Sequence, residues 1–527
     1  MGQAASYPAE LTGREVATRL FSPATGSGEA LDRRDGGGDR DFTGDLPDEC
    51  LAHVFHFLGP GDRKRCSLVC KRWLCVDGQS RQRLSLEAKA EILPFLPAMF
   101  SRFDSVTKLV LRCDRKSVSL NDEGLVMISV RCSNLLRVKI RGCREITDLG
   151  LEAFARNCKK LKKFSCGSCN VGAHGLNAVL EHCKLLEDLS VRRLRGILRS
   201  TDQVQMRSSS VLRICLKELE NGHAFEPLVA GSKTLKTLKI IRCLGDWDGV
   251  LEMIGDGNSS LSEIHLERLQ VSDVGLSALS KCTNVETLHI VKTPCSNTGL
   301  ISIAEKCKQL RKLHIDGWRT NRIGDDGLMA VAKHCLSLQE LVLTGVKATH
   351  MSVAAIASNC SKLERLALCG IGTIGDAEIA CIATKCGALR KFCIKGCPIS
   401  DVGIEALAMG CPNLVRLKVK KCRVVTGEVG EWLREQRRSL VVSVDGNEPY
   451  AMVDANGGNG GVRVLEAVVE DHPTDQIADA EASSNVNNGG RLAMVRTRLG
   501  FLACRNLVAC TLRRWSHGDD DSSTQQL

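Results

Sequence analysis

Cysteine is the residue type in this sequence with the clearest capacity for redox or metal chemistry, and it occurs 27 times in 527 residues. An odd number of cysteines spread along so long a chain does not indicate a disulfide framework, so we expect reduced thiols. Cys166 and Cys169 have the C-x-x-C spacing of a redox or metal pair, but no second such pair completes a tetrahedral site. The sequence therefore predicts no metal and no cofactor.

Catalytic motifs are missing from the sequence. It contains no P-loop, GxSxG or HExxH string, and no spacing of its 12 histidines assembles a nucleophile, a base and an orienting group. His182 and His334 end helical patterns, whereas His289 and His314 fall on expected strands. We therefore expect a non-catalytic protein.

The cysteines mark an internal repeat. Cys132, Cys158 and Cys183 are each followed three residues later by a leucine, and the same phase returns at Cys307, Cys335, Cys360, Cys386 and Cys411. Each period of about 25 residues reads L-x-x-L-x-L and then gives apolar residues at helical spacing, which predicts a short strand and a helix. Thr147-Asp148, Ser272-Asp273 and Ser400-Asp401 stand where such helices begin and are good capping residues.

This pattern resembles the cysteine-containing class of leucine-rich repeats. It predicts an α/β solenoid of horseshoe shape over residues 103–445, with strands on the inner face and helices outside. The resemblance assigns most cysteines to turns as small buried apolar residues. Cys166 then occupies a core position of its strand, and Cys169 the cysteine position that follows the strand.

A different pattern precedes the repeats over residues 42–80. Apolar residues at helical spacing predict one helix over 51–58 and another over 66–73, separated by Gly59-Pro60-Gly61. The order Leu46-Pro47-Asp48-Glu49-Cys50-Leu51, then Val54-Phe55, Leu58 and Leu68-Val69-Cys70-Lys71-Arg72-Trp73 resembles the F-box, a three-helix module that docks on the adaptor Skp1. Arg63 departs from that pattern, because an apolar residue usually stands there.

The whole layout resembles plant F-box/leucine-rich-repeat proteins of the Skp1-interacting partner and VIER F-box group, and more distantly the auxin-receptor F-box proteins. The resemblance implies a substrate-recognition subunit of an SCF-type E3 ubiquitin ligase, bound to a Skp1-like adaptor and through it to cullin. A leucine-rich-repeat scaffold without ubiquitin chemistry is the alternative. Small-molecule or inositol-phosphate sensing does not follow from the distant kinship.

Six residues carry over from the F-box pattern as adaptor contacts, namely Leu46, Pro47, Leu51, Val54, Phe55 and Leu58. For each of them internal helix packing is the alternative, and it weighs most for Leu51 and Val54, as it does for Trp73. For Leu46 and Pro47, at the start of the helix, the interface is the better interpretation.

Basic residues fall on the strand positions expected to face the concave side. They lie early in the array, at Arg137, Lys139 and Arg141, and late in it, at Lys391, Lys395, Arg416, Lys418 and Lys420, whereas the middle is acidic or mixed. We expect a protein substrate with acidic or phosphorylated segments, held mainly at the C-terminal repeats. Ordinary solvation of an exposed strand face is the alternative.

The remaining segments complete a division into six parts. Residues 1–41 form a flexible leader, 81–102 join the F-box to the repeats, 446–490 form an acidic flexible linker, and 491–527 form a basic-apolar tail. Gly2 matches the myristoylation pattern, so membrane contact is expected only if Gly2 is acylated.

Composition limits the partners. The net charge is +11, which is mild for this length, and only 4% of residues are aromatic, so nucleic-acid binding is disfavoured. There is neither a signal peptide nor a stretch of about 18 apolar residues that would span a membrane. We expect the protein in the nucleus and/or cytoplasm.

Overall fold

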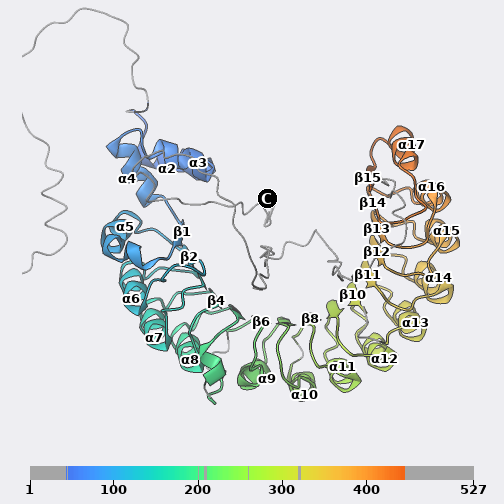
Figure 1. The fold of residues 1–527 in the computed structure, drawn as a ribbon, viewed down its shortest axis with the longest axis horizontal. Helices are drawn as coiled ribbons and strands as arrows, with labels where there is room; N and C mark the ends of the chain where they lie inside the picture. The colour runs from blue at the N-terminus through green and yellow to red at the C-terminus, as the bar shows by residue number, and fades with distance from the viewer. Residues whose placement is uncertain are drawn as a thin grey trace, which may run out of the picture.

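The computed structural model describes residue 43 and residues 45–199, 201–206, 210–258, 260–317 and 322–445. The predicted leader, acidic linker and basic-apolar tail, Gly2 included, lie outside the described residues. The described part contains an N-terminal helical module followed by a solenoid of strand and helix repeats, as predicted (Figure 1). None of the helices in these ranges is long and apolar enough to cross a bilayer.

The helical module has three helices, in agreement with the predicted number. They are α2 (Asp48–Phe57), α3 (Pro60–Cys66) and α4 (Lys71–Gln79). The single helix expected over 66–73 is wrong, because α3 ends at Cys66 and the chain is extended at Cys70. The Cys70 sulfur accepts a hydrogen bond from the backbone N–H of Trp73 at 3.4 Å and so caps α4 instead of continuing a helix.

Fifteen strands form one parallel sheet in chain order. They are β1 (Arg83–Glu87), β2 (Lys108–Arg112), β3 (Arg137–Arg141), β4 (Lys163–Gly167), β5 (Asp188–Arg192), β6 (Arg213–Lys217), β7 (Thr237–Ile241), β8 (Glu263–Glu267), β9 (Thr287–Val291), β10 (Lys312–Asp316), β11 (Glu340–Thr344), β12 (Arg365–Cys369), β13 (Lys391–Lys395), β14 (Arg416–Lys420) and β15 (Val441–Val444).

Helices follow most strands and form the outer layer. They are α5 (Leu96–Arg102), α6 (Asp122–Arg131), α7 (Asp148–Asn157), α8 (Ala173–His182), α9 (Glu226–Ala230), α10 (Asp248–Gly257), α11 (Asp273–Leu279), α12 (Asn297–Lys306), α13 (Asp325–His334), α14 (His350–Asn359), α15 (Asp376–Lys385), α16 (Asp401–Gly410) and α17 (Glu428–Gln436), with 3₁₀ turns η1 (Ala90–Phe95), η2 (Gly196–Arg199) and η3 (His223–Phe225).

The repeats stack into an arc whose inner side carries the strands and whose outer side carries the helices (Figure 1). Successive strand residues alternate between the core and the groove, so Leu341 and Leu343 are buried in the same sheet. The solenoid begins earlier than the predicted residue 103. The expected joining segment 81–102 supplies β1, which pairs with β2, and α5, which packs on α6.

Acidic residues at the helix starts join consecutive repeats. Asp376 accepts hydrogen bonds from the backbone N–H and the hydroxyl of Ser400 in the next repeat, at 2.8 and 2.6 Å. The same pair of bonds joins Asp122 to Thr147 and Asp248 to Ser272. Thr147 and Ser272 also cap their own helices as expected, whereas Ser400 has no side-chain cap.

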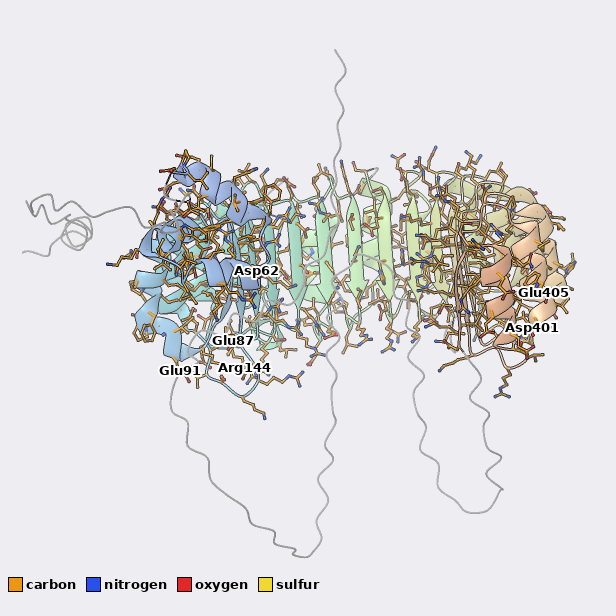
Figure 2. The ribbon with its side chains drawn as sticks, turned by 90° about the horizontal axis from the view of Figure 1, so that it is seen from above. Asp62, Glu87, Glu91, Arg144, Asp401 and Glu405 are labelled. Carbon is orange, nitrogen blue, oxygen red and sulfur yellow. The ribbon has the colours of Figure 1, made fainter. Side chains whose placement is uncertain are left out.

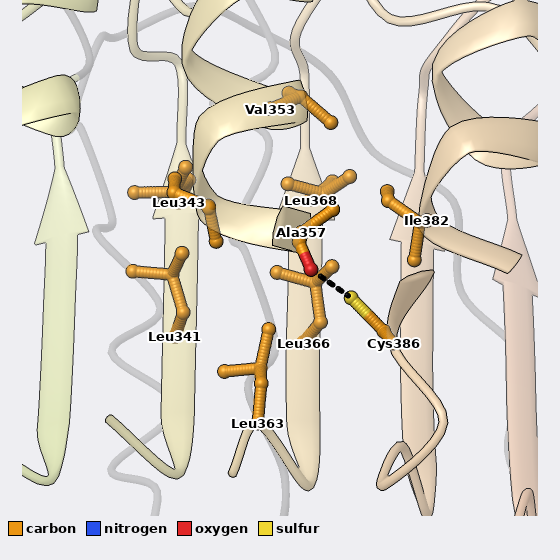
Figure 3. Close-up of a pocket in the computed structure, with 10 residues that line it drawn as sticks. Leu341, Leu343, Val353, Ala357, Leu363, Leu366, Leu368, Ile382 and Cys386 are labelled. Atoms are coloured by element: carbon orange, nitrogen blue, oxygen red, sulfur yellow. Dashed lines mark hydrogen bonds between the residues drawn. The ribbon is translucent and has the colours of Figure 1, made fainter. Parts of the chain in front are cut away.

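The cysteines hold the other end of the helices. Figure 3 shows the Cys386 thiol donating to the Ala357 carbonyl of the preceding repeat, beside a small cavity lined by apolar core residues. Cys158 and Cys183 make the same backward contacts. In this position the side-chain amide of Asn258 donates to the carbonyls of Ser232 and Leu235. This position therefore requires a small residue that donates a hydrogen bond. The expectation of a small buried apolar residue gives its size and burial but misses the hydrogen bond.

We predict that thiol titration of the freshly purified, denatured protein returns nearly all 27 cysteines as free. In the native protein Cys50, Cys70 and Cys75 should react quickly because they are exposed. Cys335 should react slowly at neutral pH, because burial raises its pKa to about 12. Ellman's reagent measures both states. Several stable disulfides, or stoichiometric zinc that survives dialysis, would contradict the prediction.

Candidate functional site

The helical module has a very small core. Leu51, Phe55 and Val76 are buried, with Trp73 packed against them and its ring 5.4 Å from that of Phe55. Six of its apolar side chains stay exposed, namely Leu46, Val54, Phe57, Leu68, Val69 and Leu74. So small a module with so much exposed apolar surface is typical of a docking element.

The structure divides the six predicted contact residues into two groups. Leu46, Pro47 and Val54 are exposed, and Val54 is thus available for contact, although internal packing was a weighty alternative for it. Leu51 and Phe55 are 2% and 1% exposed and build the core, and Leu58 is half-buried against them. Leu51 and Phe55 therefore hold α2 in place from the core, and direct contact of these two residues with an adaptor stays a prediction.

Sequence reasoning missed the most exposed apolar residues. Phe57 and Leu68 are 75% and 77% exposed, and Val69 is 64% exposed. Phe57 lies three residues after Val54, which places both on one side of α2. The spacing of Val54 and Phe57 could have indicated from the sequence that Phe57 is an exposed apolar residue. Leu68 and Val69 could be recognised as exposed only from the structure, in which α3 ends at Cys66.

Arg72 fixes the start of the docking element. Its guanidinium donates to the Asp48 carboxylate and to the Thr43 carbonyl, both at 2.8 Å, and to the Leu46 carbonyl. Fixed in this way, Leu46 and Pro47 lie at the beginning of α2 without belonging to the core.

A buried carboxylate joins the module to the solenoid. Asp77 has no exposed side-chain surface and accepts hydrogen bonds from Arg63 at 2.7 Å, from Arg81 at 2.8 and 2.9 Å, and from Arg102 of α5 at 2.9 Å. Arg63 is the residue that departs from the F-box pattern, and its partner explains the departure. Charged hydrogen bonds of this kind are strong and directional, so the module is held in one orientation.

Close packing surrounds this network. A Cβ added at Gly78 would lie 2.7 Å from the Arg102 carbonyl oxygen, so only glycine allows α4 to approach α5 so closely. The guanidinium groups of Arg102 and Arg81 lie 4.8 and 5.5 Å from the Phe103 ring centre. In the view from above, the module, marked by Asp62, lies near the N-terminal strands, and Asp401 and Glu405 mark the other end (Figure 2).

Positive charge gathers on the first strands of the concave face. The register places Arg83, Lys108, Arg137 and Lys163 in one row across β1 to β4. Burial, and then the charges of Arg137, Arg83 and Lys163, lower the pKa of Lys108. Arg137, Lys139 and Arg141 lie on the groove side of β3 as predicted, and Lys108, which the sequence analysis did not single out, completes this N-terminal basic surface.

A second basic surface covers the last strands. Lys391 and Lys395 of β13 lie beside Arg416, Lys418 and Lys420 of β14, in matched register. All five side chains alternate with buried core residues and so face the groove. We call these five residues the C-terminal basic surface.

The middle of the groove is electrically balanced. Lys239 pairs with Glu263 at 2.8 Å, and Arg365 pairs with Glu340 at 3.0 Å. Three histidines share one strand position: the His265 and His289 rings stack with centres 5.0 Å apart, and the His314 ring meets that of His289 edge-on at 5.2 Å. This balanced stretch separates the two basic surfaces.

No group of three or more potential ligands in the described residues could hold a metal ion. Cys166 and Cys169 hydrogen-bond to one another inside the core, and both occupy the repeat positions expected from the sequence.

Family models agree with this division of the chain. Residues 43–77 match the F-box-like model, and residues 131–155 match the Leucine Rich repeat model. The protein thus has an N-terminal F-box-like region followed by a leucine-rich-repeat solenoid.

Two plant proteins are similar to most of this chain. GRR1-like protein 1 of Arabidopsis thaliana is 24% identical over 88% of both chains. A transport inhibitor response 1-like protein of Oryza sativa subsp. japonica is 24% identical over 71% of this chain and 74% of its own. Among solved structures, the yeast Rad7 and Elc1 complex aligns with a TM-score of 0.41 and 16% identity, over 77% of this chain and 91% of that chain. The two family models and the two plant relatives support a plant F-box/leucine-rich-repeat protein, and membership of the VIER group stays a prediction.

We predict that Asp77→Ala lowers the free energy of unfolding by about 3–5 kcal/mol, because it leaves three arginines around a buried site without their counter-charge. Urea denaturation followed by circular dichroism measures the loss. Asp62→Ala is the matched control, since its pair with Arg65 lies in the solvent and should contribute little. Equal effects of the two substitutions would show that the Asp77 network does not hold the module.

Proposed function

We propose that the chain is the substrate-recognition subunit of an SCF-type E3 ubiquitin ligase. In this proposal the F-box-like module binds a Skp1-like adaptor, which links it to cullin, and the concave face of the solenoid binds a protein substrate. The chain itself performs no chemistry, and its role is to hold the substrate in a fixed place relative to the adaptor.

The exposed apolar residues of the helical module are the observation that carries the proposal. Val54, Phe57, Leu68 and Val69 are each at least half exposed, in a region that matches the F-box-like model. Apolar surface of this kind is stabilised when a partner covers it. The similarity to GRR1-like protein 1 and to a transport inhibitor response 1-like protein supports the same proposal.

The Asp77 network supports the coupling of the two functions. It fixes α4 against α5, so an adaptor bound to the module stands in a defined position relative to the groove. A flexible joint would let the substrate drift relative to the adaptor. The alternative, a leucine-rich-repeat scaffold that binds a partner without ubiquitin chemistry, requires neither the exposed apolar residues nor a rigid joint.

For the substrate, the proposal names a protein with acidic or phosphorylated segments. Both basic surfaces face the groove, and charge balance in the middle of the array leaves them as two separate positive regions. Lysine and arginine side chains bind carboxylates and phosphates through charge-assisted hydrogen bonds. We assign the main grip to the C-terminal basic surface.

Adaptor binding should depend on the exposed apolar residues. We predict that Leu46→Ala with Pro47→Ala weakens co-purification with Skp1, and that Phe57→Asp with Leu68→Asp abolishes it, because buried interface positions do not tolerate a charge. Leu149→Asp is the matched control, since Leu149 is 72% exposed on α7, far along the chain from the module. Undiminished binding by the Phe57 and Leu68 variant would favour the scaffold alternative.

Substrate capture should depend on the C-terminal basic surface. We predict that reversing Arg416, Lys418 and Lys420 to Glu abolishes binding of acidic and phosphoserine peptides, measured by fluorescence anisotropy, and leaves Skp1 binding intact. Reversal of Lys306, Lys333 and Lys385 to Glu changes the net charge equally on exposed helix ends and should have little effect. Unchanged peptide affinity and salt dependence after the first reversal would mean that the basic surface is merely solvated.

A further inference from the structure

One half-buried cysteine lies at the centre of the C-terminal basic surface. Cys393 occupies the middle groove position of β13, with Lys391 and Lys395 two residues away on its own strand. Lys418 lies beside it in register on β14, flanked by Arg416 and Lys420. The Cys393 thiol is therefore surrounded by lysine and arginine side chains on the groove face, unlike the buried cysteines of the repeat turns.

A second thiol contacts it from the neighbouring strand. Cys369 is the last residue of β12, pairs in register with Lys395, and hydrogen-bonds through its side chain to Cys393. The hydrogen bond to Cys393, and then burial, raise the pKa of Cys369, which is only 8% exposed, so Cys369 keeps its proton and is the donor of this bond. The Cys393 sulfur is thus the acceptor and faces the groove side of the pair.

From this arrangement we propose that Cys393 is a modification site that undergoes thiol–disulfide exchange with an acidic disulfide of the glutathione type. The Cys393 thiolate attacks one sulfur of the disulfide, and a new bond forms between the two sulfurs. The sulfur–sulfur bond of the reagent breaks, and its electron pair leaves with the second glutathione as a thiolate, which takes a proton from water. The carboxylates of the bound glutathione then lie among the lysines of the C-terminal basic surface.

The charges around Cys393 agree with this reactivity. The hydrogen bond from Cys369, and then the charges of Lys418, Arg365 and Lys420, lower the pKa of Cys393 to about 7, against the opposing effect of burial. Thiolate is the attacking species in disulfide exchange, so the reaction should accelerate as the pH rises through this value. The same cations attract an anionic reagent before any bond forms.

The solenoid provides an internal comparison. Cys215 occupies the equivalent middle position of β6 and is also half-buried, with Lys217 and Lys239 nearby. Burial raises the pKa of Cys215 although its register partner Ser190 hydrogen-bonds to it, and Arg192 takes the strand position that Cys369 occupies beside Cys393. A groove position beside lysines is therefore not sufficient, and the pairing with Cys369 distinguishes Cys393.

The experiment uses the reduced full chain and oxidised glutathione. Aliquots taken over time are quenched by alkylation, and peptide mapping by mass spectrometry gives the adduct at each cysteine. We expect Cys393 to react at least about tenfold faster than Cys215 at neutral pH, which corresponds to a pKa difference of one unit or more. With a neutral disulfide, bis(2-hydroxyethyl) disulfide, the part of the preference that comes from the pKa difference should remain, whereas the part that comes from attraction of the anionic reagent should be lost, and added salt should reduce that second part with glutathione disulfide.

Variants separate the contribution of the basic side chains to the rate at Cys393 from that of the hydrogen bond from Cys369. Lys418→Gln with Lys420→Gln should slow the reaction with glutathione disulfide several-fold more than with the neutral reagent, whereas Lys139→Gln, in the same strand position of β3, should change neither rate. Cys369→Ala should move the pH profile of Cys393 upward with both reagents, and Cys369→Ser, which keeps a donor, should restore part of the shift.

Two results would overturn the proposal. One is adduct formation at the exposed Cys50, Cys70 and Cys75 while Cys393 stays reduced. The other is an equal rate at Cys393 and Cys215 with both reagents. Neither readout involves the binding of Skp1 or of an acidic substrate peptide. Failure here therefore leaves the proposed ligase function untouched, and failure of Skp1 binding leaves this proposal untouched.

Discussion

Each repeat of the solenoid relies on its neighbour for hydrogen-bond partners. The Asp376 carboxylate at the start of one helix binds Ser400 of the next repeat, and the Cys386 thiol at the end of the helix binds a carbonyl of the preceding one. Because these bonds link repeats about 25 residues apart, a repeat in isolation would bury polar groups without partners. The arc, the parallel register and the rows of groove side chains all follow from this mutual dependence.

The Asp77 network plays the corresponding role at the N-terminal end, where no repeat precedes β1. There the solenoid meets the helical module, whose core of Leu51, Phe55 and Val76 is too small to be stable alone. Three arginines converge on one buried carboxylate and make the module an extension of the solenoid. The module gains stability from this contact and keeps its own apolar side chains for a partner.

Periodic features of the structure were predictable from the sequence, and features that occur once were not. The spacing of Leu338, Leu341 and Leu343 repeats often enough to predict strand, register and buried face. The network of Asp77 joins residues with no shared period, and Arg63 looked like a departure until its partner was known. β1 was missed because no cysteine and leucine of the repeat phase precede it, and Leu51 and Phe55 could not be told from contact residues without their burial.

The same reasoning applies to the C-terminal basic surface. Alternation along β13 and β14 placed its lysines in the groove correctly. The contact between Cys369 and Cys393 depends on side-chain reach across two strands, which strand alternation alone does not give. Composition and spacing thus located the surface but not the thiol pair within it.

The last described helix is tied to its neighbour more firmly than the helices before it. Arg437 follows α17 in the place that a cysteine takes in other repeats, and its guanidinium donates to the carbonyls of Ala408, Cys411, Pro412 and Leu414. A planar group with five donors thus binds four carbonyls of the preceding repeat, whereas the Cys411 thiol binds two. Separating α17 from the repeat before it would break all four of these charged hydrogen bonds, so this end of the array should resist fraying.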